Sequence, residues 1–214
     1  MQLIAVYAIP VIFAITLHEA AHGFVAYRLG DPTAKLLGRV TANPIKHIDP
    51  VGTILVPGLI LLASKAVGGA MLFGWAKPVP VDTYKLGKPK RDMGLVAVAG
   101  PLANIIMAFA WAVSLKMMVL TGVGNEFFIR MTLAGISVNL VLAVLNLMPV
   151  PPLDGGRILV SVLPPNLAQP VARLEPYGLV ILLLLLATGV LGDILLPLVN
   201  TAREIILTIL GFER

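Results

Sequence analysis

Cysteine is absent from this chain of 214 residues, and charged side chains are scarce. Without cysteine the chain can form neither a disulfide nor a thiolate metal site, so any metal ion must be held by histidine and carboxylate. Charged residues make up 13% of the sequence, whereas about a quarter is usual in soluble domains. Hydrophobic residues make up 58%, and the mean hydropathy is +0.94. This composition predicts an all-α polytopic membrane protein.

The net charge is +5 at pH 7. In a soluble protein such a balance would suggest nucleic acid as a partner, but most basic residues here lie in loops between apolar segments. In those loops they set the topology and meet anionic lipid. We therefore expect a lipid bilayer around the chain and no nucleic acid. The start, Met1-Gln2, offers no basic region for a signal peptide, and the sequence makes no prediction of oligomeric state.

Apolar segments long enough to cross a bilayer, at about 20 residues per crossing, divide the chain. Three of them form the expected core, and a fourth follows near the C-terminus: residues 3–27, 93–120, 127–147, and 177–191 with an extension to 199. The tail from Thr201 is expected to be an interfacial amphipathic helix. We accordingly divide the chain into a core at 1–160 and a C-terminal loop, span and interfacial helix at 161–214.

The segment after the first span is harder to assign. The alternation in residues 38–42 predicts a short strand or β-hairpin, whose edge would suit an extended peptide. Residues 51–73 are apolar but are interrupted by Pro57-Gly58, Ser64-Lys65 and Gly68-Gly69. They form either a crossing helix or a re-entrant segment.

The sequence His18-Glu19-Ala20-Ala21-His22 lies near the end of the first span. Positions four apart on a helix are separated by about 6 Å along the axis and ~40° around it, so both imidazoles can reach one metal ion. A carboxylate beside them can serve as a general base toward water at that metal. A lone histidine in a membrane helix is more often a packing residue or a proton relay. The spacing, together with Glu19, favours a metal site.

Catalytic zinc sites usually have three protein ligands, so a third ligand is needed. The candidates are Asp31, His47, Asp49 and Asp154. We favour Asp154, because an acid beside a membrane span is costly unless it meets a cation or metal, and the glycines after it allow close backbone approach. Asp31 and Asp49 lie in a turn-rich loop, where an aspartate needs no special reason.

This assignment constrains the topology. The span ending near Leu147 must finish on the face where the first span exits, so residues 51–73 should enter and return rather than cross. Most basic residues then gather on that face, which the positive-inside rule makes cytoplasmic.

The combination of HEAAH at 18–22 with NLMPVPPLDGG at 146–156 resembles the site-2 protease family of intramembrane zinc metalloproteases, and the stretch from Gly100-Pro101 to Asn104 also matches. The resemblance covers about residues 3–160. It implies that His18, His22 and Asp154 bind Zn²⁺ and that Glu19 is the catalytic base. Asn146 would orient substrate or stabilise the oxyanion, although capping of an unwound helix end explains it about as well.

The resemblance implies an intramembrane zinc endopeptidase that cleaves the transmembrane helix of a protein substrate near the cytoplasmic face. It also implies a multi-pass protein of a prokaryotic cell membrane, in a short form that has neither a PDZ nor a CBS domain. The alternative is a transporter or ion-conducting protein whose histidines and carboxylates carry protons or metal. Asn104 and Asn139 are interpreted as interhelical hydrogen-bonding residues rather than catalytic ones.

Overall fold

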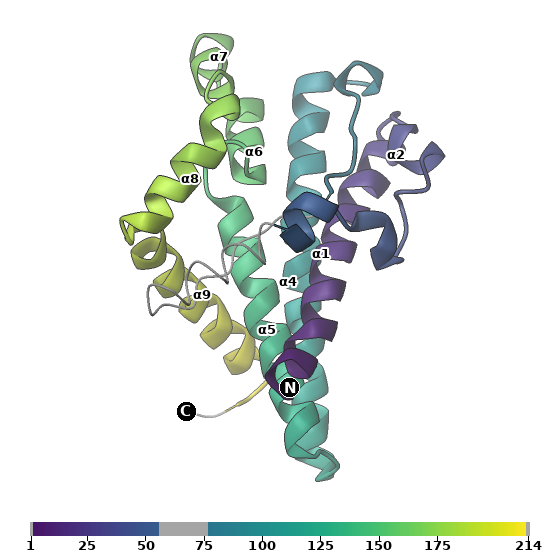
Figure 1. The fold of residues 1–214 in the computed structure, drawn as a ribbon, viewed down its shortest axis with the longest axis vertical. Helices are drawn as coiled ribbons and strands as arrows, with labels where there is room; N and C mark the ends of the chain where they lie inside the picture. Colours follow the sequence, from purple (N-terminus) through teal and green to yellow (C-terminus); the bar gives the residue numbers. More distant parts are fainter. Residues whose placement is uncertain (1, 56–76, 213–214) are drawn as a thin grey trace.

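Three long helices form the centre of the molecule, which is a computed structural model that describes residues 2–55 and 77–212 (Figure 1). They are α1 (Gln2–Arg28), α4 (Pro89–Thr121) and α5 (Glu126–Leu147), and each packs against the other two. Helix α4 begins with Pro89 in its first turn, where a missing N–H costs nothing, and ends at Gly122 with φ +65°. The side chain of Asn125 then accepts the Phe128 N–H and starts α5.

Small and amide-bearing residues allow these helices to approach closely. A Cβ on Gly135 of α5 would lie 2.5 Å from the indole ring of Trp111 on α4, so the ring occupies the space that glycine leaves. Ala108 and Ala112 are fully buried in the same interface. Apolar chains gain little by leaving lipid for a protein interior, so such close packing and a few interhelical hydrogen bonds hold membrane helices together.

The C-terminal third is built from α6 (Asp154–Val162), α7 (Pro165–Ala172), the short η4 (Glu175–Tyr177), α8 (Gly178–Ala187) and α9 (Val190–Ile209). The expected bounds of the C-terminal segments are wrong, because the run from 177 to 199 is divided and no separate helix begins at Thr201, while the assignment of a membrane span and an interfacial helix stays a prediction. Gly189 adopts φ +81° and ends the run, and one helix then continues past Thr201. Helix α9 packs against α5 with Leu195 and Val199.

Short helices follow α1, namely α2 (Thr33–Leu36), η1 (Pro44–His47) and η2 (Pro50–Leu55). The predicted strand at 38–42 is not present, and the described residues contain no strand. Gly38 adopts φ +65° and the Arg39 N–H bonds the Ala34 carbonyl, so these residues close α2 instead of extending. The alternation misled because Arg39 turns inward and is only 7% exposed.

The chain returns to the same end of the bundle at Lys77. Its N–H donates to the His47 carbonyl (3.0 Å), and after η3 (Thr83–Lys85) the Gly87 N–H donates to the carbonyl of Leu29 (3.1 Å). Helix α4 therefore starts beside the place where α1 ends. The predicted re-entrant course of 51–73 lies largely outside the described residues and stays a prediction.

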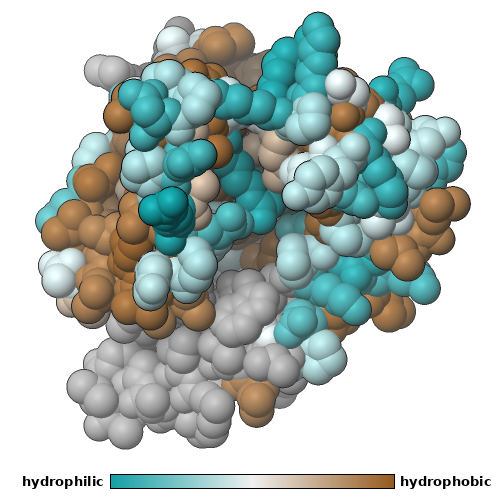
Figure 2. Space-filling model, turned by 90° about the horizontal axis from the view of Figure 1, so that it is seen from above, coloured by the Kyte–Doolittle hydropathy of each residue, from teal (hydrophilic) through white to brown (hydrophobic). Residues whose placement is uncertain are grey.

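Four segments of the described residues are long and apolar enough to span a membrane: Ala5–Arg28, Pro89–Thr121, Glu126–Leu147 and Pro165–Ala187. The protein is an integral membrane protein. The end that carries α2, α6, α7 and the start of α4 lies uppermost in Figure 1. Seen from that end, hydrophilic residues surround a hollow between the two sides of the molecule (Figure 2).

Candidate metal centre

His18 and His22 lie one turn apart on α1, and each is 8% exposed. Their rings meet edge to face with centroids 4.7 Å apart, and the two Nε2 atoms are 3.1 Å apart. The helical spacing thus brings both rings to one point, as the sequence predicts. That point is the interface between α1 and α4, because both Nδ1 atoms have partners on α4.

The partners on α4 fix which nitrogen of each ring carries the proton. His22 Nδ1 is 2.7 Å from the Val96 carbonyl, which can only accept, so this nitrogen is the donor. His18 Nδ1 is 2.6 Å from Asn104 Oδ1. The amide nitrogen of Asn104 is already committed as a donor to Ala14 O (3.2 Å) and Asn139 Oδ1 (3.0 Å). Both neutral imidazoles therefore turn an Nε2 lone pair toward the same space.

Asp154 completes this group from the first residue of α6 and is 6% exposed. Its Oδ2 lies 3.2 Å from His18 Nε2 and 3.3 Å from His22 Nε2. Two glycines after it let the turn fold tightly. A Cβ on Gly155 would lie 2.2 Å from the carbonyl oxygen of Leu147, and one on Gly156 would lie 2.5 Å from the Pro151 nitrogen. The sequence Leu-Asp-Gly-Gly therefore returns the carboxylate to the end of α5.

Three lone-pair acceptors thus face one another with no donor between them. The two Nε2 atoms and Asp154 Oδ2 form a triangle with sides of 3.1, 3.2 and 3.3 Å. In a tetrahedral site with zinc–ligand bonds of about 2.0–2.1 Å, neighbouring ligand atoms lie roughly 3.3–3.4 Å apart. Within the described residues these three are the group whose ligand atoms converge in this way. The donor set fits zinc with one position open for water or substrate.

Gly100 of α4 faces this triangle. A Cβ at this position would lie 2.4 Å from His22 Nε2 and 2.6 Å from His18 Nε2. Only glycine leaves the ligand atoms their space, and Pro101 follows within the same helix. The sequence indicates this stretch through the family resemblance, and the structure supplies its physical reason.

Glu19 lies beside the triangle and is half-buried. Its Oε2 accepts the backbone N–H of Val79 at 2.7 Å. Val79 belongs to residues 77–82, an extended stretch that crosses α1 and that we call the strap. A Cβ on Gly23, one turn after Glu19, would lie 3.1 Å from Val79 Cγ1, so the strap lies directly on the helix.

The other candidate ligands have different partners. Asp31 is fully buried; its carboxylate accepts the N–H groups of Thr33 (2.9 Å) and Asp82 (2.7 Å). Burial acts to raise the pKa of Asp31, but a hydrogen bond from the Thr33 hydroxyl and these two N–H groups outweigh it and hold the pKa below its usual value. His47 is 2% exposed, and its Nε2 lies 3.1 Å from the Thr41 carbonyl. Neither side chain joins the triangle, and Asp49 is also outside it.

Asn104 and Asn146 differ from what their positions suggest. Asn104, interpreted as interhelical glue, does bond Asn139, but it also fixes the tautomer of His18. The sequence feature that could have indicated this contact is the position of Asn104 four residues after Gly100, one turn further along α4. Asn146 lies in the last turn of α5, and its Nδ2 donates to the Leu142 carbonyl at 2.9 Å. Its proposed part in catalysis stays a prediction.

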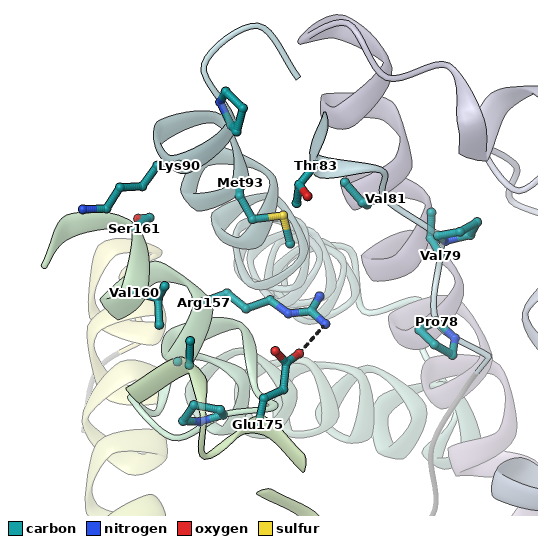
Figure 3. Close-up of a pocket in the computed structure, with 15 residues that line it drawn as sticks. Pro78, Val79, Val81, Thr83, Lys90, Met93, Arg157, Val160, Ser161 and Glu175 are labelled. Carbon is teal, nitrogen blue, oxygen red and sulfur yellow. Dashed lines mark hydrogen bonds and ion pairs between the residues drawn. The ribbon is translucent and has the colours of Figure 1, made fainter. Parts of the chain in front are cut away.

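A cavity of about 630 Å³ lies between the strap, the start of α4, α6 and η4 (Figure 3). Gly156, two residues after Asp154, and Val79, which bonds Glu19, both line it. Arg157 reaches across it to Glu175, and the two charges are 3.2 Å apart. The cavity is therefore lined by chain neighbours and hydrogen-bond partners of the carboxylates of Asp154 and Glu19.

Comparisons with known proteins agree with this chemistry. The model of Peptidase family M50 matches residues 124–187. The protein named "Putative zinc metalloprotease YwhC" of Bacillus subtilis (strain 168) is 39% identical over 97% of this chain and 91% of its own length. The protein named "Putative zinc metalloprotease Rip2" of Mycolicibacterium smegmatis is 30% identical over 85% of this chain and 66% of its own length. No solved structure matches.

Replacing Gly100 by Ala should lower the zinc-to-protein ratio of the purified protein by at least half. The new methyl group would overlap both Nε2 positions, and neighbouring α4 backbone cannot yield without moving Pro101. Metal analysis by mass spectrometry measures the effect. Gly192→Ala is the control, because a Cβ there meets nothing within 4 Å, and it should retain the full ratio. A Gly100→Ala protein with full zinc would contradict this packing.

Replacing Asn104 by Leu should weaken zinc binding about 10- to 100-fold, the usual cost of losing the partner that orients a ligating histidine. Leucine has a similar volume but leaves the Nδ1–H of His18 without an acceptor. Competition with a chelator of known affinity measures the change. Asn139→Leu is the comparison, since Asn139 bonds Asn104 and not the histidine. Equal effects of both substitutions would mean that helix packing, not ring orientation, is what Asn104 supplies.

Proposed function

Because this chain belongs to peptidase family M50, the site-2 proteases, and is thus a zinc metalloprotease, we propose that it cleaves transmembrane segments of membrane-anchored proteins near the cytoplasmic face of a prokaryotic cell membrane. The observation that carries this proposal is the convergence of three lone-pair acceptors inside a bundle of membrane-spanning length. A transporter or ion conductor is not favoured, since the relatives are named as metalloproteases.

In this proposal His18, His22 and Asp154 hold the zinc ion. Zinc, when bound, activates water as a nucleophile and polarises the scissile carbonyl. Glu19 takes a proton from the attacking water and passes it to the leaving amine, which requires a carboxylate within hydrogen-bond reach of both. The half-buried carboxylate of Glu19, one residue from a ligand and held by Val79, has a suitable position. The role of Asn146 is to orient substrate from the last turn of α5.

The substrate class follows from the depth of the site. The triangle is buried between helices of a membrane protein, and in this proposal substrate approaches it from the hydrophilic side through the cavity beside α6. A helical substrate must unwind locally, because a peptide bond inside a helix is shielded by the surrounding side chains. Residues 1–160 carry every proposed catalytic group, and residues 161–214 flank them with α7, α8 and α9.

The orientation follows from charge. The end of the bundle that holds the cavity carries most of the basic side chains, in its loops and the adjoining helix ends, whereas the loop between α4 and α5 contains none and Lys116 and Arg130 lie on the helices beside it. Basic residues stay preferentially on the cytoplasmic side. We therefore place this end, and the nearby metal centre, toward the cytoplasm.

Glu19→Gln should abolish cleavage of a co-expressed single-span substrate, a loss of at least about 100-fold, while zinc stays bound. Glutamine keeps the shape of the side chain and an acceptor for the Val79 N–H, but it cannot take a proton. Asp154→Ala is the matched variant and should lose zinc and cleavage together. Continued cleavage by Glu19→Gln would end the general-base role, and unchanged zinc in Asp154→Ala would move the third ligand elsewhere.

Single cysteines can test the orientation, since the natural chain has none. Tyr84 before α4 is 96% exposed and Val123 after it is 75% exposed. The 33 residues of α4 extend about 50 Å, more than the ~30 Å hydrocarbon core. Tyr84→Cys should react with a membrane-impermeant maleimide only after the cells are opened, and Val123→Cys in intact cells. The reverse pattern would place the site on the outer side.

A further inference from the structure

The strap is held along its whole length. Pro78 and Pro80 lack an N–H, so residues 77–82 offer four backbone donors. Three of them are hydrogen-bonded: Lys77 to His47 O at 3.0 Å, Val79 to Glu19 Oε2 at 2.7 Å, and Asp82 to Asp31 Oδ2 at 2.7 Å. One of the three acceptors is the proposed catalytic base, while the other two lie in the loop after α1.

Arg39 binds the carbonyl groups of the strap, whereas the contacts above involve its N–H groups. One guanidinium nitrogen, Nη2, donates to the carbonyl of Lys77 at 2.7 Å and to that of Pro78 at 3.4 Å. The side chain is only 7% exposed, and in the described part of the chain no carboxylate pairs with it. Burying a cation is costly, and among the described residues the two strap carbonyls are what compensates it, since the buried Nε has no partner there. A buried arginine that serves two backbone carbonyls is a fixed anchor.

Val79 connects this anchor to α1. The valine is 8% exposed, and its side chain lies over Gly23 while its N–H reaches Glu19 one turn earlier. The peptide group between Pro78 and Val79 is therefore held at both ends: its carbonyl accepts from Arg39 and its N–H donates to Glu19. The position of Arg39 is transmitted to the carboxylate through one rigid planar unit.

We propose that the strap orients the catalytic base, with the Val79 N–H as the contact and Arg39 as a positioning residue. This inference rests on the proposed function of Glu19. The bond engages Oε2 and restricts the rotation of the carboxylate, which leaves Oε1 to accept the proton of the attacking water. A free glutamate side chain would spread over several rotamers. Holding it in one orientation supplies part of the barrier reduction that comes from placing reactants correctly.

A backbone donor suits this role because it cannot exchange protons with the base. A lysine or histidine in the same place would compete for the proton that Glu19 must transfer. The amide N–H stays neutral and bonds one oxygen, which leaves the other oxygen as the proton acceptor. The Val79 N–H therefore orients the base, whereas Asn104 and the Val96 carbonyl, the partners of the histidine Nδ1 atoms, orient the metal ligands.

The direct test is Val79→Pro, which removes the single N–H while the Pro-rich strap keeps its extended form. We expect kcat on a single-span substrate to fall about 10- to 100-fold with KM and zinc content little changed. Val81→Pro is the matched control. It makes the same change two residues on, at an N–H that donates to no acceptor within the described residues, and should lower kcat far less. Equal effects of the two substitutions would overturn the proposal.

Arg39→Met tests the anchor, since methionine fills similar space without donating to the strap. We expect kcat to fall, as in Val79→Pro, at full zinc occupancy. Arg39→Lys should recover part of the lost kcat. A purely structural role would instead lower zinc content and kcat in parallel. That result would remove Arg39 from the proposal.

Amide exchange tests the contact without any cleavage. The Val79 N–H should exchange slowly in the native protein and in Glu19→Gln, because the glutamine oxygen still accepts, and quickly in Glu19→Ala. Unchanged exchange in Glu19→Ala would show that the bond does not hold the strap to the base. If the native protein cleaves no membrane substrate, the proposed function fails, yet the exchange result still decides whether Val79 and Glu19 are joined.

Discussion

Everything at this centre depends on three lone-pair acceptors held within 3.3 Å of one another. Two imidazole nitrogens and a carboxylate oxygen repel each other at such distances in a poorly solvated interior. A divalent cation turns that repulsion into attraction. The surrounding protein therefore works to keep the acceptors together. Asn104 and the Val96 carbonyl fix the two rings, and the glycines beside Asp154 bring its carboxylate to them.

The bundle can hold the three acceptors together because glycines at the contact points let its helices pack closely against one another. Gly100 faces the ligand atoms, Gly23 accommodates the strap, and Gly135 receives the ring of Trp111. Each is a position at which one added carbon would displace a functional or packing contact. Close approach also brings backbone groups such as the Val96 carbonyl within reach of side chains on the neighbouring helix. Packing and chemistry therefore use the same residues here.

Patterns within one helix were predictable from the sequence, whereas most contacts between distant segments were not. The four-residue spacing of His18 and His22 predicts a shared helix face, and the long apolar runs predict the spans at α1, α4 and α5. The third member of the triangle could be favoured over Asp31 because the cost of an unpaired acid depends on its surroundings. The structure places Asp154 beside both histidines, and its role as a metal ligand stays a prediction.

Other features left no periodic signal. The alternation at 38–42 is typical of a strand, but Arg39 is drawn inward by carbonyls almost forty residues away. The apolar run after 177 gave no hint that Gly189 would end α8, since glycine is common in membrane helices. The Val79 contact is made by a backbone N–H, which every residue except proline carries. Sequence patterns record side chains, so such a contact is visible only in three dimensions.

The bond between Lys77 and His47 has a consequence for what sets the position of Glu19. Together with the Asp31 and Arg39 contacts, it ties the strap to the segment that follows α1 at three points, and none of these three residues belongs to the metal triangle. The Val79 N–H therefore reaches Glu19 from a backbone that is held by the segment after the same helix that carries Glu19. The carboxylate and the metal ligands are thus positioned by separate sets of contacts.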